Sequence, residues 1–193
     1  MNFSRLGAIL ALTATFAFAQ QMGAPGSRLD KFTLQSLEGA PVTVETAGKL
    51  TAVFFIATRC PVSNDYNLRM QALVNEYESK GITFVFANSN ESEPAGEVKQ
   101  HIANNRFTFT VHKDPENRFA DLLHAEVTPE AFLFDKTGTV IYHGAIDNSR
   151  NPAGVIKRPL KDAFDAALAG KAVAVTEHKA FGCSIKRVRK DSE

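Results

Sequence analysis

The sequence predicts an α/β fold in which helices flank one central mixed β-sheet. Two apolar runs, residues 50–57 and 82–87, have the composition of buried strands. A helical pattern separates them, and strand and helix patterns keep alternating further along the chain. The 193 residues are enough for one ordinary domain with a sizeable core. We therefore expect a single α/β domain.

The first 19 residues are predicted to be an export signal. Arg5 precedes an apolar stretch from Leu6 to Ala17, and Ala17-Phe18-Ala19 fits the small-x-small pattern of a cleavage site. This stretch is shorter than the roughly 20 residues that span a bilayer, which favours a cleaved signal over a membrane anchor. The mature chain is then expected to begin at Gln20, without a transmembrane segment. It is periplasmic if the source is a Gram-negative bacterium and secreted otherwise.

The domain itself is expected to cover residues 31–193. Residues 20–30 are polar and rich in glycine and proline, which predicts a flexible leader. The alternating stretch that follows, residues 32–44, contains a glycine in its middle and predicts an N-terminal β-hairpin. The last stretch, from about residue 171, is expected to be an irregular or weakly extended C-terminal extension.

Between these ends, the remaining elements follow from periodicity and turn signals. Apolar residues from Tyr66 to Tyr77 recur on one helical face, which predicts a helix from about Pro61 to Lys80. The predicted strands are residues 107–114, 130–135 and 139–147, and the last two are joined by a tight Asp-Lys-Thr-Gly turn. The other predicted helices are residues 94–105, 117–125 and 159–170.

Charge and short motifs exclude several classes of function. The formal net charge is +1, and removal of Arg5 with the signal leaves the mature chain near neutral, so nothing predicts nucleic-acid binding. The sequence has no glycine-rich phosphate loop and no C-x-x-C-H motif for c-type haem. The five histidines show no compact metal-ligand spacing. We therefore expect no cofactor and no metal.

Cys60 is the first candidate for chemistry, because it stands where a buried strand meets a helix. The first N–H groups of a helix lack intrahelical partners and favour a thiolate, which is the nucleophilic form of cysteine. Pro61 suits the first helical position. Arg59 adds positive charge if its side chain turns toward the sulfur. A buried, inert cysteine is the alternative.

Cys183 is the only possible intramolecular partner of Cys60, because the chain has two cysteines. Disulfides persist outside the cytosol, so export favours a disulfide framework. Cys183 follows Gly182, which gives the backbone freedom at that point. The sequence leaves open whether the two cysteines pair or whether Cys183 is free or purely structural.

The stretch "FFIATRCPVSNDY" resembles the active-site joint of thioredoxin-like proteins. Together with "FTLQSLEGAPVTV" and "VTPEAFLFDKTGTVIYHGAID", it resembles the redoxin branch, which includes the alkyl hydroperoxide reductase/thiol-specific antioxidant (AhpC/TSA) group and exported thiol-disulfide oxidoreductases. The resemblance covers roughly residues 28–170 and implies a thioredoxin-like fold. It also implies a cis peptide bond at Thr128–Pro129, where the backbone of Thr128 pairs with an extended substrate segment beside Cys60.

Two departures from the family patterns narrow the activity that the resemblance implies. Ser63 stands where the dithiol oxidoreductases carry a second cysteine, and its hydroxyl can bind a thiolate but cannot resolve a mixed disulfide. Val53 and Ala57 stand where the peroxiredoxins carry a proline and a threonine or serine. General thiol chemistry remains, with Cys183 as the resolving cysteine if the C-terminal segment folds back over the joint.

We therefore expect an exported thiol-disulfide oxidoreductase with Cys60 as its nucleophile. Its expected partners are a protein or small-molecule thiol, disulfide or peroxide, together with an external reductant. The alternative is a copper carrier that uses Cys60, Cys183 and His178, since thiolates and imidazole suit a soft ion, or a redox-inactive binding protein.

Overall fold

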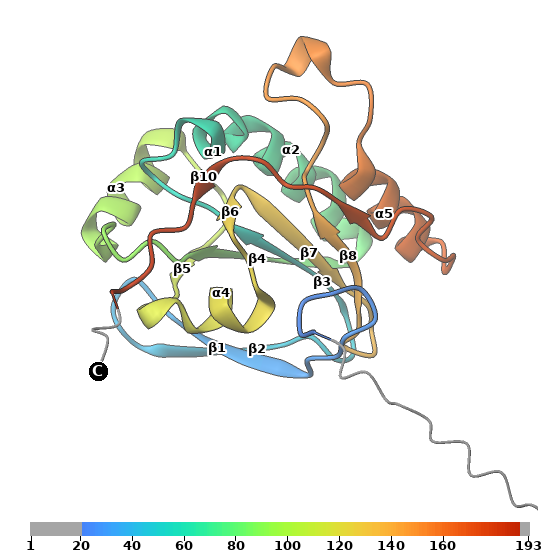
Figure 1. The fold of residues 1–193 in the computed structure, drawn as a ribbon, viewed down its shortest axis with the longest axis horizontal. Helices are drawn as coiled ribbons and strands as arrows, with labels where there is room; N and C mark the ends of the chain where they lie inside the picture. The colour runs from blue at the N-terminus through green and yellow to red at the C-terminus, as the bar shows by residue number, and fades with distance from the viewer. Residues whose placement is uncertain (1–20, 190–193) are drawn as a thin grey trace, which may run out of the picture.

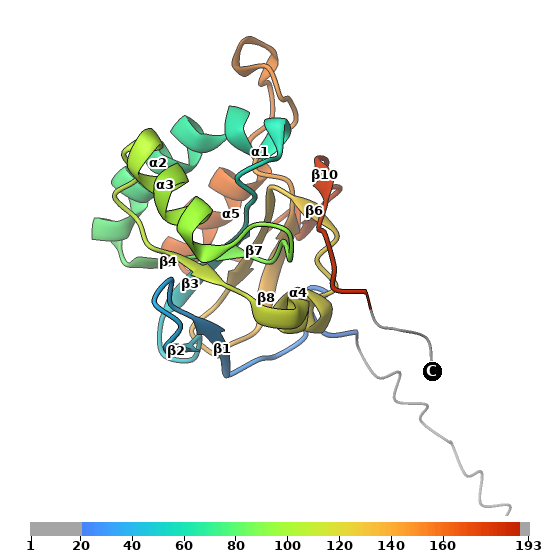
Figure 2. The ribbon, with the colours of Figure 1, turned by 90° about the vertical axis from the view of Figure 1, so that its left-hand side faces the viewer.

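The computed structural model describes residues 21–189, and the predicted export signal lies outside them. Within this range, a central eight-stranded sheet has the order β2-β1-β5-β4-β3-β7-β8-β9. Helices cover both of its faces, as Figures 1 and 2 show. The strands of this sheet are β1 (Lys31–Gln35), β2 (Pro41–Glu45), β3 (Leu50–Phe55), β4 (Ile82–Asn88), β5 (Val111–Lys113), β7 (Glu130–Phe134), β8 (Val140–Gly144) and β9 (Glu177–His178).

The pairing of the central strands confirms the predicted mixed sheet. β3 and β4 are parallel neighbours, with Leu50 opposite Ile82. On its other side β3 pairs antiparallel with β7, which forms the predicted antiparallel hairpin with β8. The N-terminal hairpin of β1 and β2 is also present, with Phe32 opposite Val44.

The sheet separates two apolar layers, and β3 contributes to both. Ala52 and Phe54 face a layer that includes side chains of α2, α3 and α5, while Val53 and Phe55 face a layer formed with β1, β2 and α4. Burial on both faces explains why this strand is continuously apolar in sequence. The helices are α1 (Pro61–Asp65), α2 (Asn67–Tyr77), α3 (Ala95–Asn105), α4 (Arg118–Leu123) and α5 (Pro159–Leu168).

The helix predicted from Pro61 to Lys80 is divided into α1, α2 and a final 3-10 turn, η1 (Glu78–Lys80). The division falls at Tyr66, whose backbone N–H bonds to the carbonyl oxygen of Ser63, three residues back. Such a bond tightens the turn and ends regular α-helical pairing. The Tyr66 side chain is buried, and its hydroxyl donates to Asp147 at 2.8 Å.

Residues 21–30 differ from the flexible leader expected from their composition. Gly26 donates its N–H to the carbonyl oxygen of Val140, and Val140 donates back to Ser27. Ser27 is buried. These backbone bonds hold the segment against the edge of β8.

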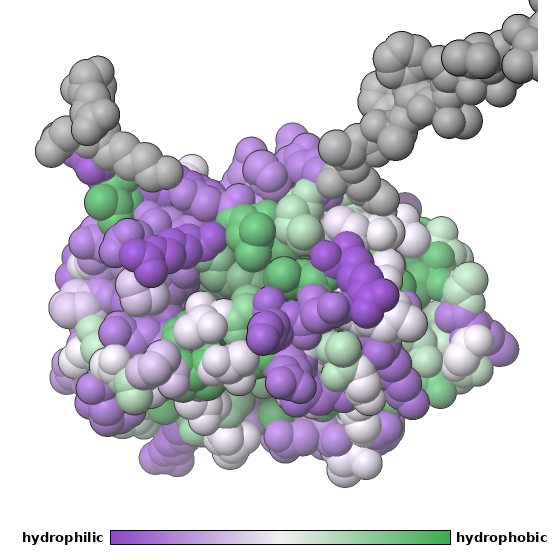
Figure 3. Space-filling view, turned by 90° about the horizontal axis from the view of Figure 1, so that it is seen from below, coloured by the Kyte–Doolittle hydropathy of each residue, from purple (hydrophilic) through white to green (hydrophobic). Residues whose placement is uncertain are grey.

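On the face seen from below in Figure 3, where β1 and β2 lie, hydrophilic residues surround smaller apolar areas.

The tail, which we define as residues 171–189, crosses the top of the sheet as the red segment in Figure 1. It contributes β9, which lies parallel to β8, and β10 (Cys183–Ser184), which pairs antiparallel with β6 (Val127–Thr128). The irregular or weakly extended conformation expected from the sequence is therefore two very short strands joined by irregular segments. The tail thus begins at the end of α5 and places Cys183 at the start of α1.

Candidate active site

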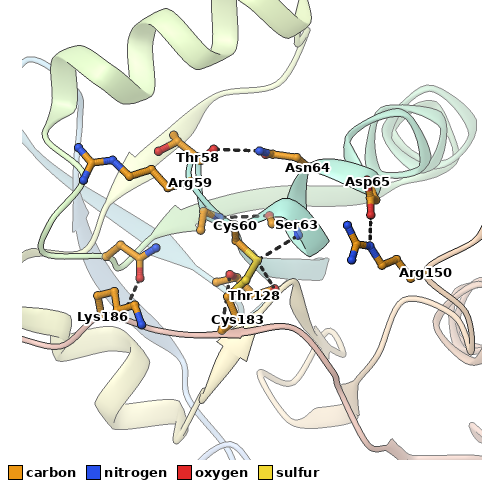
Figure 4. Close-up of a disulfide and its surroundings, with 12 residues drawn as sticks. Thr58, Arg59, Cys60, Ser63, Asn64, Asp65, Thr128, Arg150, Cys183 and Lys186 are labelled. Atoms are coloured by element: carbon orange, nitrogen blue, oxygen red, sulfur yellow. Dashed lines mark hydrogen bonds and ion pairs between the residues drawn. A yellow bond between two sulfur atoms is a disulfide. The ribbon is translucent and has the colours of Figure 1, made fainter.

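Cys60 and Cys183 form a disulfide in the structure, with their Cα atoms 5.8 Å apart (Figure 4). Cys60 is only 3% exposed and lies directly before α1. Cys183 lies on β10 and is partly exposed. The structure thus brings together the two sulfur atoms that the sequence analysis singled out, although 123 positions separate them in the chain.

The start of α1 positions the sulfur of Cys60 through the backbone of Ser63. Cys60 is the N-cap residue, and its Sγ accepts the backbone N–H of Ser63 at 3.3 Å. Pro61 occupies the first helical position, as expected, where its missing N–H leaves no bond unmade. The hydroxyl oxygen of Ser63 accepts the backbone N–H of Ala57 at 3.2 Å.

Thr128 lies directly beside the disulfide. Its carbonyl oxygen is 3.3 Å from the Sγ atom of Cys60, and its backbone pairs with that of Cys183. The Thr128–Pro129 bond is cis, as the resemblance implied, and both residues are buried. The backbone edge expected to meet a substrate segment is therefore occupied by the chain's own tail.

The side chain of Arg59 turns away from the sulfur. Its Nε and Nη2 atoms donate to the carboxylate of Glu97 at 2.8 and 2.5 Å. Glu97 lies in the first turn of α3 and also accepts the hydroxyl of Thr58. The expected cation beside Cys60 is thus replaced by a surface ion pair that ties the loop before Cys60 to α3.

A buried carboxylate that was not predicted from the sequence, that of Glu93, fixes the backbone of the loop before Cys60. Glu93 is 1% exposed and accepts the backbone N–H groups of Thr58 at 2.8 Å and Arg59 at 3.0 Å. It also accepts the side-chain amides of Asn88 and Asn90. Burial raises the pKa of Glu93, but these four hydrogen bonds outweigh it and hold the pKa below its usual range.

A sequence signal for Glu93 existed in the polar run "NSNESE", residues 88–93, directly after the apolar run of β4. The carboxyl ends of neighbouring parallel strands lie at one edge of a sheet, so this run had to end near the loop that leaves β3. The same run also contacts the tail, because Asn90 accepts the backbone N–H of Lys186 at 2.6 Å.

Within residues 21–189 the structure brings together no group of three or more His, Cys, Asp or Glu side chains able to hold a metal ion. His178, the third ligand of the copper alternative, lies on β9 beside Gly144. In the same range no helix is long and apolar enough to cross a bilayer.

The model of the AhpC/TSA family matches residues 25–143, which include Cys60, Thr128 and Pro129. The chain belongs to this family. The match ends before the tail, so Cys183 lies outside the segment that the family model describes. No protein among the curated sequences gives a significant match.

Solved structures confirm the thioredoxin-like redoxin fold. A hypothetical protein from Sinorhizobium meliloti is 28% identical, with a TM-score of 0.78, and the match covers 86% of this chain and 96% of that one. An uncharacterized conserved protein from Geobacillus kaustophilus is also 28% identical, with a TM-score of 0.79 and coverage of 89% and 95%. A putative thiol:disulfide interchange protein DsbE from Chlorobium tepidum is 25% identical, with a TM-score of 0.62 and coverage of 75% and 97%.

Proposed function

We propose that this chain is an exported thiol-disulfide oxidoreductase in which Cys60 is the nucleophile and Cys183 resolves the mixed disulfide. The observation that carries the proposal is the Cys60–Cys183 disulfide, which joins the strand-helix joint to the tail. Membership in the AhpC/TSA family and the likeness to a protein described as a thiol:disulfide interchange protein support it. The proposal of export rests on the N-terminal sequence pattern.

The reaction begins from the reduced protein. The thiolate of Cys60 attacks one sulfur of a substrate disulfide, so a new S–S bond forms as the substrate bond breaks and its first thiolate leaves. The thiolate of Cys183 then attacks the Cys60 sulfur and releases the second substrate thiolate. The two substrate thiolates take up the two protons that the cysteines lost. The substrate is reduced to two thiols, and the protein is oxidised to the form seen in the structure.

The surroundings of Cys60 suit the leaving thiolate when an external thiol reopens this disulfide. The backbone N–H of Ser63 donates to the Cys60 sulfur, and a hydrogen bond to the charged form favours it. Cys183 is partly exposed while Cys60 is buried, so the reductant's thiolate attacks Cys183 and Cys60 leaves.

Single cysteine variants test the proposal. Cys60→Ser is expected to abolish exchange with a small disulfide such as oxidised glutathione. Cys183→Ser is expected to react once and to retain the small thiol on Cys60, as a mass increase that dithiothreitol reverses. Turnover of Cys183→Ser at the wild-type rate would show that Cys183 is not the resolving cysteine. A Cys60→Ser variant with full activity would overturn the role of Cys60.

A further inference from the structure

The tail covers the backbone edge that lies closest to Cys60. Within β10, Cys183 pairs with Thr128 and Ser184 pairs with Val127. The pairing continues beyond the strand, because Ile185 donates its N–H to the carbonyl oxygen of Glu126 at 2.9 Å. One way in which a protein binds an extended polypeptide segment is to accept it as an added strand at a free edge. The edge of β6 beside Cys60 is already used by the chain itself.

The contacts that hold the tail do not depend on the disulfide. Lys186 donates its N–H to Asn90 and accepts the N–H of Glu91 at 2.9 Å. Val188 donates its N–H to the side chain of Asn117 at 2.7 Å. Ile185 is buried in the apolar layer that includes α4. None of these contacts involves a sulfur atom, so we expect the tail to stay docked in the reduced protein.

Gly182 shows how closely the tail approaches β6. A Cβ atom at this position would lie 2.0 Å from the carbonyl oxygen of Thr128 and 3.3 Å from the nitrogen of Pro129. No side chain fits in that space, since real Cβ atoms do not approach backbone atoms so closely. The approach leaves no room for another polypeptide between the tail and the cis-proline segment.

We propose that the docked tail restricts disulfide exchange at Cys60 to low-molecular-weight thiols and disulfides and excludes extended polypeptides. This inference rests on the proposed function. A small disulfide does not need to pair with the edge of β6, and it can approach the site from the side of Cys183, which is partly exposed. An extended polypeptide needs the edge of β6 and reaches it only in molecules whose tail has lifted. Because such molecules are rare, its rate of exchange is reduced in proportion to their fraction.

Two thionitrobenzoate probes test the restriction on full-length protein. One is the mixed disulfide of thionitrobenzoate with free cysteine, and the other is the same disulfide on a cysteine inside a short, extended, uncharged peptide. In each reaction the Cys60 thiolate attacks the probe's cysteine sulfur and expels coloured thionitrobenzoate. The protein is Cys183→Ser, which keeps the tail but leaves Cys60 as its only thiol. Rates are divided by those of each probe with a small free thiol, which removes intrinsic reactivity.

Cys183→Ser is expected to prefer the small probe by about 100-fold, which is a difference of about 2.7 kcal/mol in activation free energy. Adding Gly182→Ala drives a Cβ atom into Thr128 and lifts the tail, so this preference is expected to shrink at least about tenfold. Ser184→Ala is the matched control, because its side chain is exposed on the same strand. It is expected to keep the preference of Cys183→Ser.

A second tail-opening variant, Ile185→Asp, places a carboxylate in the apolar layer and is expected to act like Gly182→Ala. Faster amide hydrogen exchange at residues 183–186 verifies that either variant has lifted the tail. Equal normalised rates of both probes with Cys183→Ser would overturn the proposal, and so would an unchanged preference after the tail has lifted. If the small probe reacts with none of these variants, Cys60 is not a nucleophile and the proposed function itself is overturned.

Discussion

The carboxylate of Glu93 accepts the backbone N–H of Arg59 at 3.0 Å, and this bond fixes the chain one residue before Cys60. Glu93 also accepts the side-chain amide of Asn90, whose oxygen in turn accepts the backbone N–H of Lys186. A short polar relay therefore connects the loop that carries Cys60 to the tail that carries Cys183. Together with the pairing of β10 with β6, these bonds hold two cysteines so far apart in sequence at bonding distance.

Glu93→Gln is expected to destabilise the fold by about 3 kcal/mol at pH 7, because the new amide group turns a donor toward N–H donors and leaves buried groups unpaired. Chemical unfolding in urea measures this loss. Glu97→Gln is the matched control, since its ion pair with Arg59 lies at the surface, where solvent screening leaves such pairs little effect on stability. Equal losses for the two variants would contradict the role assigned to Glu93.

The same variant changes the acid sensitivity of the fold. The pKa of Glu93 is lowered in the folded state from its ordinary value of 4.5. The unfolded chain therefore binds the proton more readily, so this stabilisation is complete above pH 4.5 and is lost as the pH falls through the folded value. Wild-type stability is expected to drop more steeply below pH 4.5 than that of Glu93→Gln. Parallel curves for the two proteins would show that folding does not lower the pKa of Glu93.

The strands were the most predictable part of this fold, because β3 and β4 are apolar along nearly their whole length. The run from Phe107 to Thr110 shows where alternation misleads. It reads as a strand, yet only Val111–Lys113 pair in the sheet. The ring of Phe109 instead stacks on the ring of Phe86, with 3.8 Å between the ring centroids, in the apolar layer that includes the helices α2, α3 and α5. Packing of the aromatic rings, which no local pattern specifies, decided between the two conformations.

The site was predictable only at the residues that carry a strong local signal. Cys60 and Pro61 lie at a predicted strand-helix joint, and Thr128-Pro129 directly precedes a predicted strand. Glu93 does not, because a single glutamate in a polar loop looks like a solvated residue until β3 and β4 are known to be neighbours. The direction of Arg59 was likewise undetermined, since it depends on the position of Glu97 in α3.

The disulfide is expected to contribute strongly to stability. It joins residues 123 positions apart, and closing so long a loop stabilises the fold by about 4 to 5 kcal/mol in the chain-entropy model. Unfolding of the oxidised wild type in guanidinium chloride, compared with Cys60→Ser/Cys183→Ser, measures the difference. The wild type kept under dithiothreitol is the control and should resemble the double variant. A difference below about 1 kcal/mol would mean that the unfolded chain keeps the tail near α1.

His112 is expected to make the fold less stable in mild acid. Burial lowers the pKa of His112 from 6.5, and its Nδ1 atom is buried without a hydrogen-bond partner in the described part of the chain. The unfolded chain binds a proton on His112 near pH 6.5, whereas the folded chain binds it only at lower pH. The contribution of His112 to stability is therefore complete above pH 6.5 and is lost as the pH falls below that value. His112→Leu should flatten the dependence of the melting temperature between pH 7 and pH 5.

His101 is expected to add to this effect, because burial lowers its pKa while Glu93 and Glu97 oppose the shift. The variant His101→Leu separates the two contributions, and the double variant is expected to be nearly independent of pH over the same interval. A wild-type melting temperature that stays constant from pH 7 to pH 5 would contradict the prediction for both histidines.

Gly144 is expected to be essential for seating the tail on the sheet. Its φ angle is +135°, and a Cβ atom there would lie 1.7 Å from the carbonyl oxygen of His178. Gly144→Ala therefore combines backbone strain with the displacement of β9, at an expected cost of about 2 to 4 kcal/mol. Gly48→Ala is the control, because Gly48 has a φ of +89° with nothing within 4 Å of the added atom. It bears the backbone strain alone and should cost about 1 kcal/mol.

Since β9 leads into β10, Gly144→Ala should also slow formation of the Cys60–Cys183 disulfide in a glutathione buffer, whereas Gly48→Ala should not. Equal effects of the two substitutions on stability and on disulfide formation would show that the contact between Gly144 and His178 does not hold the tail.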